Sequence, residues 1–144
     1  EMPLEAFFFF FFRTALGPAE FFTALRLPPS PGRQGWGYAR RTRTVIDIAL
    51  VSSCVVIQAS NGVCGDIRVS LGAVGPTPLR ATQAEAVLRG QQPSAALLAQ
   101  ASRLAAEEAR PISDVRCSAE YRKDMVEVLS KRCLESALSM LQML

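Results

Sequence analysis

The stretch that decides the fold runs from Ile67 to Arg80 and reads Ile-Arg-Val-Ser-Leu-Gly-Ala-Val-Gly-Pro-Thr-Pro-Leu-Arg. It begins as a strand, because apolar residues alternate with polar or small ones over residues 67–72. Gly72 and Gly75 then permit close backbone approach or positive φ, and the Gly-Pro pairing predicts positive φ at Gly75. The following Thr82-Gln-Ala-Glu85 predicts a helix that begins with a capping box. We therefore expect strands before this stretch and helices after it.

The composition is that of a globular protein. The 144 residues suffice for one domain with a core, and 49% of them are hydrophobic and 20% charged. The net charge of +3 is too small to indicate a nucleic-acid partner by itself. The sequence contains no histidine, which excludes a histidine-based hydrolytic triad and a histidine-ligated metal centre within this chain. The chain starts at Glu1 and continues with Met2, so we expect it to be the interior of a longer protein.

The four cysteines are expected to be free thiols. They are Cys54, Cys64, Cys117 and Cys133, and none belongs to a Cys-x-x-Cys pair. A zinc site or a thioredoxin-like redox motif is therefore not indicated. The N-terminus has neither the basic region nor the cleavage site of a secretory signal. Together these features predict a reducing, cytoplasmic location.

Six consecutive phenylalanines, residues 7–12, dominate the N-terminal segment. The run is shorter than the roughly 20 apolar residues that cross a bilayer, so we expect no membrane span. Side chains alternate between the two faces of a strand, so we expect one half of the phenylalanines to turn inward and the other half to be exposed. Such an apolar surface suggests one alternative function, a non-catalytic protein-interaction module.

Strands are expected in the first half of the chain. Residues 20–27 resemble a strand that ends at a Pro-Pro pair, and residues 28–37 resemble a loop. Residues 45–58 are β-branched and apolar and predict a long strand. Asn61-Gly62 predicts a two-residue type I′ turn. That turn would place Val56 opposite Ile67 and Cys54 opposite Val69, so that the apolar residues share one face.

Three helices are expected in the second half. The first covers residues 83–89 and ends at Gly90, and the second runs from the N-cap Ser94 to about Ala109. The third follows the N-cap Ser118 and continues to near Ser139. This order predicts an α+β fold in which an antiparallel sheet of three to four strands carries about three helices on one face.

Two clusters of polar residues have no interpretation so far. The basic run Arg40, Arg41 and Arg43 could be a solvated edge that discourages strand-to-strand aggregation, and we expect Asp47 to pair with one of these arginines. A nucleic-acid site there would need a wider basic surface with stacking aromatic residues, so no nucleic-acid partner is expected. A second cluster is interpreted as structural, and its members are Asp114, Arg116, Glu120, Tyr121 and Arg122.

Three segments carry a resemblance to a known family. They are residues 41–51 (Arg-Thr-Arg-Thr-Val-Ile-Asp-Ile-Ala-Leu-Val), residues 67–88, and residues 111–122 (Pro-Ile-Ser-Asp-Val-Arg-Cys-Ser-Ala-Glu-Tyr-Arg). They resemble the C-terminal domain of the FAD-binding medium subunit of molybdenum hydroxylases, the carbon monoxide dehydrogenase and xanthine dehydrogenase flavoprotein family. The resemblance implies that residues 1–28, including a first strand, are a connector from a missing FAD-binding domain. Residues 29–144 would be the C-terminal-like domain.

The resemblance also implies a function. A molybdopterin subunit oxidises the substrate, a subunit with [2Fe–2S] clusters passes the electrons on, and FAD delivers them to an acceptor. This chain would help to pack the FAD-binding domain of its parent chain and to dock both partner subunits. FAD would be held mainly by the absent domain, because Gly72, Gly75 and Gly90 do not form a Gly-x-Gly-x-x-Gly helix entry. We therefore expect the multi-subunit oxidoreductase to be active and this fragment alone to be inactive.

The candidate site residues follow from the resemblance alone. Tyr38, Arg40, Arg41 and Arg43 are expected near the flavin or its acceptor. Some family members carry a lysine after the aromatic residue, where this chain has Ala39, so direct contact with a nicotinamide acceptor is not implied. No catalytic residue and no metal ligand is assigned.

Overall fold

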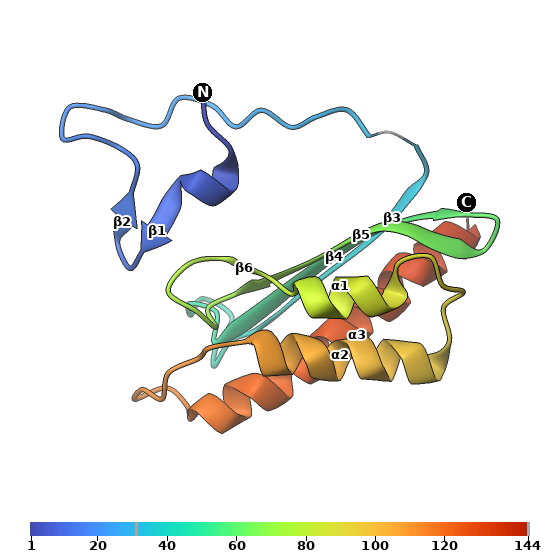
Figure 1. Ribbon diagram of the computed structural model, residues 1–144. Coiled ribbons are helices and arrows are strands. Elements are labelled where there is room, and N and C mark those ends of the chain that lie inside the picture. The colour runs from blue at the N-terminus through green and yellow to red at the C-terminus, as the bar shows by residue number, and fades with distance from the viewer. Residues whose placement is uncertain (31, 144) are drawn as a thin grey trace.

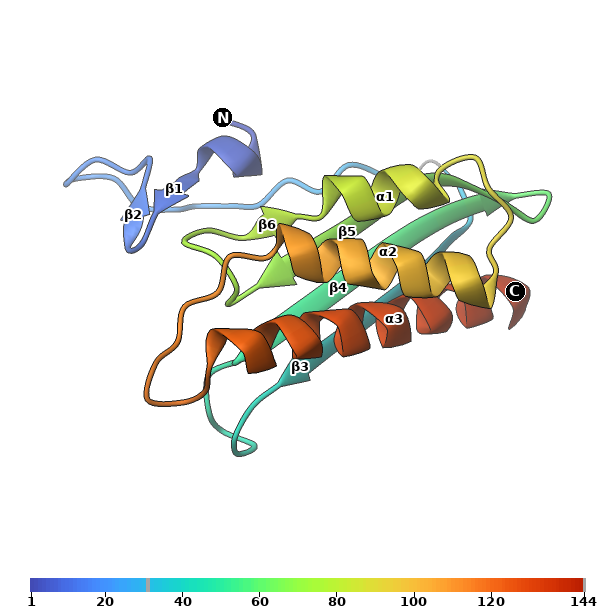
Figure 2. The same ribbon diagram turned by 60° about the horizontal axis from the view of Figure 1, so that its bottom comes forward.

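A four-stranded antiparallel sheet forms one layer of the computed structural model, which describes residues 1–30 and 32–143 (Figure 1). The strands follow the order β3 (Gln34–Arg41), β4 (Val51–Ser60), β5 (Val63–Gly72) and β6 (Leu79–Arg80). Three helices cover one face of this sheet, and they are α1 (Thr82–Leu88), α2 (Ala95–Glu108) and α3 (Ala119–Met143) (Figure 2). The predicted α+β class is therefore confirmed.

The core lies between the helices and the inner face of the sheet. Val55 and Ile57 of β4 and Ile67 of β5 are fully buried there. They pack in one cluster with α-helical residues such as Leu98 and Leu134. Each such side chain contributes roughly 1.5–3 kcal/mol when fully buried, so this layer supplies most of the driving force for folding.

The N-terminal segment lies outside this two-layer body, on the side of the sheet away from the helices (Figure 1). It contains a 3-10 turn at Leu4–Ala6 and a small hairpin of β1 (Phe8–Phe10) and β2 (Arg13–Thr14). The expected strand at residues 20–27 is wrong, because no other strand lies beside these residues to pair with them. The expected inward-facing half of the phenylalanine run is also wrong. Residues 8–12 are all exposed, because their hairpin is a separate two-stranded sheet that lies outside the two-layer body.

Strand β3 replaces most of the loop that the sequence predicts at residues 28–37. Gly35, Gly37 and Ala39 face α3, while Trp36 and Tyr38 face away from it. Helix α3 lies so close that a Cβ atom at Gly35 would overlap the Ala137 carbonyl. A Cβ atom at Gly37 would overlap the Cys133 carbonyl in the same way. The two glycines therefore allow β3 and α3 to pack closely against each other. The predicted strand at residues 45–58 begins only at Val51, and residues 42–50 are a loop.

The hairpin between β4 and β5 has the predicted turn but a different register. Asn61 and Gly62 both adopt positive φ, +53° and +76°, as a type I′ turn requires. A bulge near Gly65 then adds one residue to β5, so Ile57 rather than Val56 lies opposite Ile67, and Val55 rather than Cys54 lies opposite Val69. The shift places the larger apolar set of β4 in the core.

The caps of α2 and α3 are confirmed, but the cap of α1 is not the predicted one. The Ser94 hydroxyl accepts from Leu97 N–H at 3.3 Å, and the Ser118 hydroxyl accepts from Tyr121 N–H at 3.1 Å. At α1 the N-cap is Ala81, without a side-chain cap bond. Its free N–H groups, those of residues 83 and 84, instead donate to the Glu108 carboxylate of α2 at 3.0 and 3.3 Å.

The predicted capping-box carboxylate, Glu85, has a different role because it is buried beside β5 and β6. It accepts from the Val69 N–H at 2.9 Å and from the Arg80 guanidinium at 2.7 Å. This bidentate pair raises the pKa of Arg80. Glu85 thus joins α1 to the sheet and cannot reach back to its own helix end.

Positive φ after β5 occurs at Ala73 and not at Gly75. Ala73 has φ +61°, and its carbonyl accepts from the Arg122 guanidinium at 3.3 Å. The buried arginine thus holds a conformation that a glycine could adopt without strain. Gly90, by contrast, has φ +75° just after α1, as predicted for a C′ glycine.

Candidate functional site

The helices leave one face of the sheet uncovered, and we call this the open face. Trp36, Tyr38 and Arg40 of β3 project from it, and both aromatic rings are more than half exposed. In the neighbouring strand, Tyr38 lies opposite Cys54, and Trp36 lies opposite Val56. A flat surface with two aromatic rings and a guanidinium can stack on or pair with an aromatic or anionic group.

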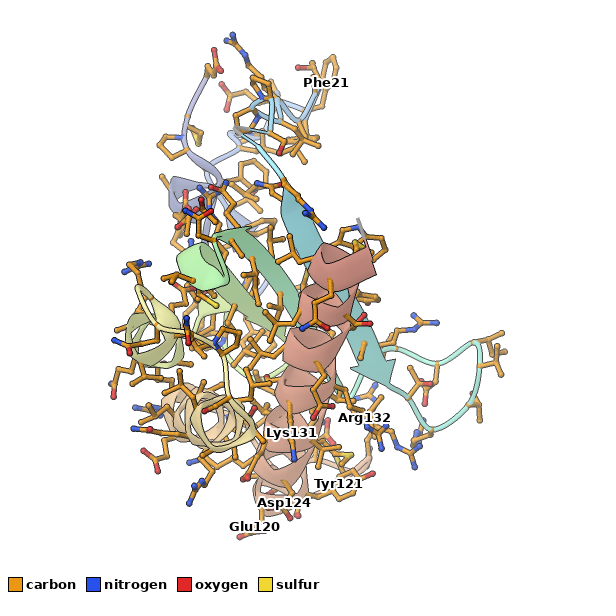
Figure 3. All side chains as sticks on the ribbon, turned by 90° about the vertical axis from the view of Figure 1, so that its right-hand side faces the viewer. Phe21, Glu120, Tyr121, Asp124, Lys131 and Arg132 are labelled. Carbon is orange, nitrogen blue, oxygen red and sulfur yellow. The ribbon has the colours of Figure 1, made fainter. Side chains whose placement is uncertain are left out.

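Two of the four predicted site residues therefore share the open face, whereas Arg41 does not. Arg41 alternates to the other face of β3, where its Nε donates to the Tyr121 hydroxyl of α3 at 3.2 Å. Its carbonyl also accepts from Leu50 N–H at 2.7 Å, which closes the loop between β3 and β4. Tyr121 lies on the lower part of α3 in Figure 3. Arg41 thus links a loop to a helix.

Arg43 lies in the β3–β4 loop and is engaged by Asp47, as predicted for one of the arginines. The Nε–Oδ2 distance is 2.6 Å, and Asp47 also accepts from Ile48 N–H at 2.9 Å. The hydrogen bond that Arg43 donates to Asp47 raises the pKa of Arg43, and the same bond lowers the pKa of Asp47. Both groups stay charged across the physiological pH range, so neither can act as an acid or base there.

The second polar cluster surrounds a buried arginine. Arg122 is 5% exposed, and its Nη1 donates to the Leu50 carbonyl at 2.6 Å, while its Nη2 pairs with Asp114 at 3.0 Å. Asp114 also accepts from the backbone N–H groups of Arg116 and Cys117. The Arg116 N–H is the strongest of several donors that hold the pKa of Asp114 far below its usual range. Arg122 therefore fastens together the chain before β4, the chain after β5 and the loop before α3.

Sequence reasoning missed two features of this end of the domain. The open face was missed because the glycines of β3 were interpreted as loop residues. Alternation of small and aromatic residues in Gly35-Trp-Gly-Tyr-Ala39 is the signal that could have revealed it. Arg122 was placed in a structural cluster, but its burial could not be predicted, since charged residues rarely become fully buried.

The cysteines and carboxylates do not form a reactive centre. All four cysteines are free, and burial raises the pKa of Cys54, Cys64 and Cys133. Their thiols are therefore weak nucleophiles at neutral pH. In the part of the chain that the structure describes, no group of three or more Cys, Asp or Glu residues could hold a metal ion. None of the helices in the described ranges is long and apolar enough to cross a membrane.

Comparison with known proteins decides the family. The sequence profile of the CO dehydrogenase flavoprotein C-terminal domain matches residues 36–137. The chain belongs to this family. The match runs from the open-face strand β3 into helix α3, and it confirms the resemblance that residues 41–51, 67–88 and 111–122 carry.

The chain is similar to the carbon monoxide dehydrogenase medium chain of Afipia carboxidovorans, to which it is 37% identical over 124 residues, 86% of this chain and 43% of that protein. The nicotine 6-hydroxylase medium subunit of Paenarthrobacter nicotinovorans is 32% identical over 126 residues, 88% of this chain and 44% of that protein. A xanthine dehydrogenase FAD-binding subunit from Escherichia coli is 24% identical over 131 residues, 88% of this chain and 44% of that protein. This chain therefore spans less than half the length of these relatives.

The fold agrees with solved structures of the family. A chain of carbon monoxide dehydrogenase from Hydrogenophaga pseudoflava superimposes with a TM-score of 0.89 at 32% identity, covering 94% of this chain and 47% of that one. A chain of a Cu,Mo-CO dehydrogenase gives a TM-score of 0.87 at 34% identity, with the same coverage of both chains. The predicted architecture, a sheet with helices on one face, is that of the CO dehydrogenase flavoprotein C-terminal domain.

Proposed function

We propose that this chain is the C-terminal domain of the FAD-binding medium subunit of a molybdenum hydroxylase, and that it packs the flavin domain and docks partner subunits for electron transfer to an acceptor. The family match and the names of the relatives support this assignment. FAD, held mainly by another domain of the parent protein, would relay electrons that reach it from [2Fe–2S] clusters and molybdopterin on separate subunits. Residues 1–28 would be the connector from that domain, since the family match begins only at residue 36.

The observation that carries the proposal is the open face. A sheet with one uncovered face and exposed aromatic rings is incomplete as a packing unit, and a preceding domain would cover it. Within this face we assign Tyr38 and Arg40 to the neighbourhood of the flavin or acceptor. Arg41 and Arg43 would act through Tyr121 and Asp47, by fixing the adjacent loop.

The chemistry of Arg40 suits this role. A guanidinium beside a flavin ring favours the reduced, more negative form and so raises the reduction potential. Tyr38 offers a ring face for stacking and a hydroxyl for hydrogen bonding. The open face supplies one wall of a site only. It has no glycine-rich loop that leads into the N-terminus of a helix. It is therefore suited to contact the ring system of FAD and not its pyrophosphate.

The test uses the full-length parent protein. We expect Arg40→Gln to lower the flavin reduction potential and Tyr38→Leu to weaken FAD binding, with unchanged melting temperatures. Lys131→Gln, on the exposed side of α3, is the matched control and should change neither quantity (Figure 3). A parent protein that purifies without FAD would contradict the function, and potentials unaffected by Arg40→Gln would contradict the site assignment.

The alternative, a protein-interaction module that uses the N-terminal phenylalanines, has one observation in its favour. Phe9, Phe10 and Phe12 are each more than half exposed to solvent. Replacement of these three residues by serine in the parent protein separates the two proposals. Loss of a partner interaction with intact FAD content would favour the alternative. We also propose a cytoplasmic location, which the free cysteines support.

A further inference from the structure

We propose that Arg40, Ser52 and Gly72 form a site on the open face that binds an oxyanion, the carboxylate, phosphate or sulfonate group of a small electron acceptor. The three residues belong to β3, β4 and β5, and we call them the oxyanion notch. This inference rests on the proposed function, because that function leaves open which acceptor takes the electrons from the flavin.

The register of the sheet brings the oxyanion notch into one row. Arg40 lies opposite Ser52, and Ser52 lies opposite Gly72. The adjacent residues Val51 and Leu71 are buried in the core, so alternation along the strands places the row on the open face. Directly opposite side chains of an antiparallel pair have Cβ atoms about 5 Å apart. A single small group can therefore contact neighbouring strands at the same time.

Gly72 leaves room in this row for the Ser52 hydroxyl. A Cβ atom at Gly72 would overlap Ser52 Oγ, so the hydroxyl leans over the glycine. Within residues 1–30 and 32–143, this hydroxyl has no hydrogen-bond partner. Ser52 is only half buried, so its O–H can donate to a group that approaches from solvent. The row thus offers an unused donor above a position that has no side chain.

The charge of Arg40 is not neutralised by any carboxylate of the described chain, unlike that of the other arginines beside this face. Arg68 of β5 pairs with Asp66 at 3.0 Å, and Arg80 of β6 pairs with Glu85 at 2.7 Å. Asp66 is the only carboxylate in β3, β4 and β5. A cation without a counterion attracts an anion more strongly than a paired one does. The electrostatic attraction of the open face for an anion is therefore centred on Arg40.

The Arg40 guanidinium keeps most of its donors free. Its Nη2 donates to the Val45 carbonyl at 3.4 Å, which holds the side chain at one point. The guanidinium carries further N–H donors, and two parallel N–H groups match the two oxygens of a carboxylate or phosphate. Arg40 and Ser52 together supply a forked cation and a neutral hydroxyl. This donor set is suited to an oxyanion and would leave an apolar ligand without a partner.

The position of the oxyanion notch indicates that the oxyanion belongs to the acceptor. Tyr38 precedes Arg40 by two residues on the same face of β3, about 7 Å along the strand. The Tyr38 ring is the surface that we assign to the neighbourhood of the flavin or acceptor. A small acceptor whose oxyanion lies in the notch would therefore hold its ring system beside that surface. There it would take two electrons and protons from the reduced flavin, leaving FAD oxidised.

The first measurement is the binding of inorganic phosphate to the full-length parent protein, by calorimetry at constant ionic strength. We expect Arg40→Gln to weaken binding by about tenfold or more, and Ser52→Ala and Gly72→Ala to weaken it by about tenfold each. Gly72→Ala removes no charge and pushes the hydroxyl aside, so it tests the notch itself. Arg68→Gln and Ser70→Ala, matched changes on the same face, should bind phosphate like the wild type.

The second measurement compares two acceptors that differ in one oxyanion group, naphthoquinone sulfonate and unsubstituted naphthoquinone. The flavin of the parent protein is reduced with dithionite, and its reoxidation by each quinone is followed by stopped-flow absorption. We expect the wild type to favour the sulfonate, and Ser52→Ala to lower that preference by about tenfold. The ratio of the two rates cancels any effect that is common to both quinones, such as a changed flavin potential.

The outcomes separate this inference from the proposed function. A wild type that does not bind phosphate, or equal losses in Arg40→Gln and Arg68→Gln, would overturn the oxyanion notch while leaving the function intact. An unchanged preference for the sulfonate in Ser52→Ala would also overturn it, since the notch would then not hold the acceptor. A parent protein that purifies without FAD would refute the proposed function, whereas the phosphate titration would still decide whether the notch binds an oxyanion.

Discussion

Replacing Arg122 by methionine should destabilise the domain by about 2–4 kcal/mol, because this side chain holds three chain segments together. Its guanidinium donates to the Leu50 carbonyl at 2.6 Å and to the Ala73 carbonyl at 3.3 Å, and it pairs with Asp114 at 3.0 Å. Methionine keeps most of the buried apolar stem and removes only these polar contacts. The substitution therefore isolates the effect of the guanidinium.

The magnitude follows from what the substitution leaves behind. A buried carbonyl without a donor costs roughly 1–3 kcal/mol, and this cost applies to Leu50, whereas the Ala73 carbonyl is only partly buried and adds less. Asp114 keeps its hydrogen bonds to Arg116 and Cys117, so the free-energy cost of removing its partner Arg122 is small. Relief of the desolvation cost of the buried guanidinium, whose Nε has no partner among the described atoms, offsets part of the total. The net loss of about 2–4 kcal/mol corresponds to a fall in melting temperature on the order of 10 °C.

The assay combines urea unfolding with amide hydrogen exchange. Arg116→Met is the control, because Arg116 contacts the same carboxylate but is about one-third exposed, and it should cost no more than about 1 kcal/mol. Faster exchange should appear first in residues 42–50 and 111–118, while β4 and β5 follow the global stability. Equal effects of the two substitutions, or exchange unchanged in both loops, would show that Arg122 does not hold the loops.

Four further predictions concern packing, capping, pH and the cofactor. Gly37→Ala should destabilise by about 1–3 kcal/mol in thermal unfolding, because its Cβ would overlap α3, whereas Gly32→Ala, with open space around it, should be neutral. Glu108→Ala should cost about 1 kcal/mol in the same assay by uncapping α1, and Thr82→Ala should cost less than that, contrary to a capping box. Asp114 has a depressed folded-state pKa, so its stabilising effect should be complete above about pH 4 and should disappear as the pH falls further, as an acid unfolding series would detect. The isolated chain should be colourless, and a flavin absorption band that persists through gel filtration would contradict this.

The sequence predicted the class of the fold because helix periodicity and serine caps are local signals. Ser94 and Ser118 cap as expected, and Asn61-Gly62 forms the expected turn. The features that the sequence did not predict correctly depend on contacts between distant parts of the chain. The bulge near Gly65 and the position of Glu85 are set by which side chains the core accepts, and that choice is made only when strands and helices meet.

The arrangement of the candidate site residues could be predicted only in part for a similar reason. Resemblance indicated Tyr38 and the three arginines, and the structure separates them, because alternation along β3 sends Arg40 and Arg41 to opposite faces. The family pattern cannot reveal the open face, since that surface arises from the placement of all three helices on one side. The burial of Arg122 is likewise a property of three converging segments and has no signature in any one of them.

The close contact of β3 with α3 has a consequence for the order of folding. The first strand of the main sheet rests on the last helix, and the Arg33 guanidinium donates to the Leu141 carbonyl across almost the whole domain. Contacts of such large sequence separation form late and slow the search for the native state. During synthesis the inner face of β3 must wait, uncovered, until the residues of α3 have emerged from the ribosome. A nascent chain at that stage exposes a strand that is prone to pair with other chains, so the timing of α3 governs how much of this protein escapes aggregation.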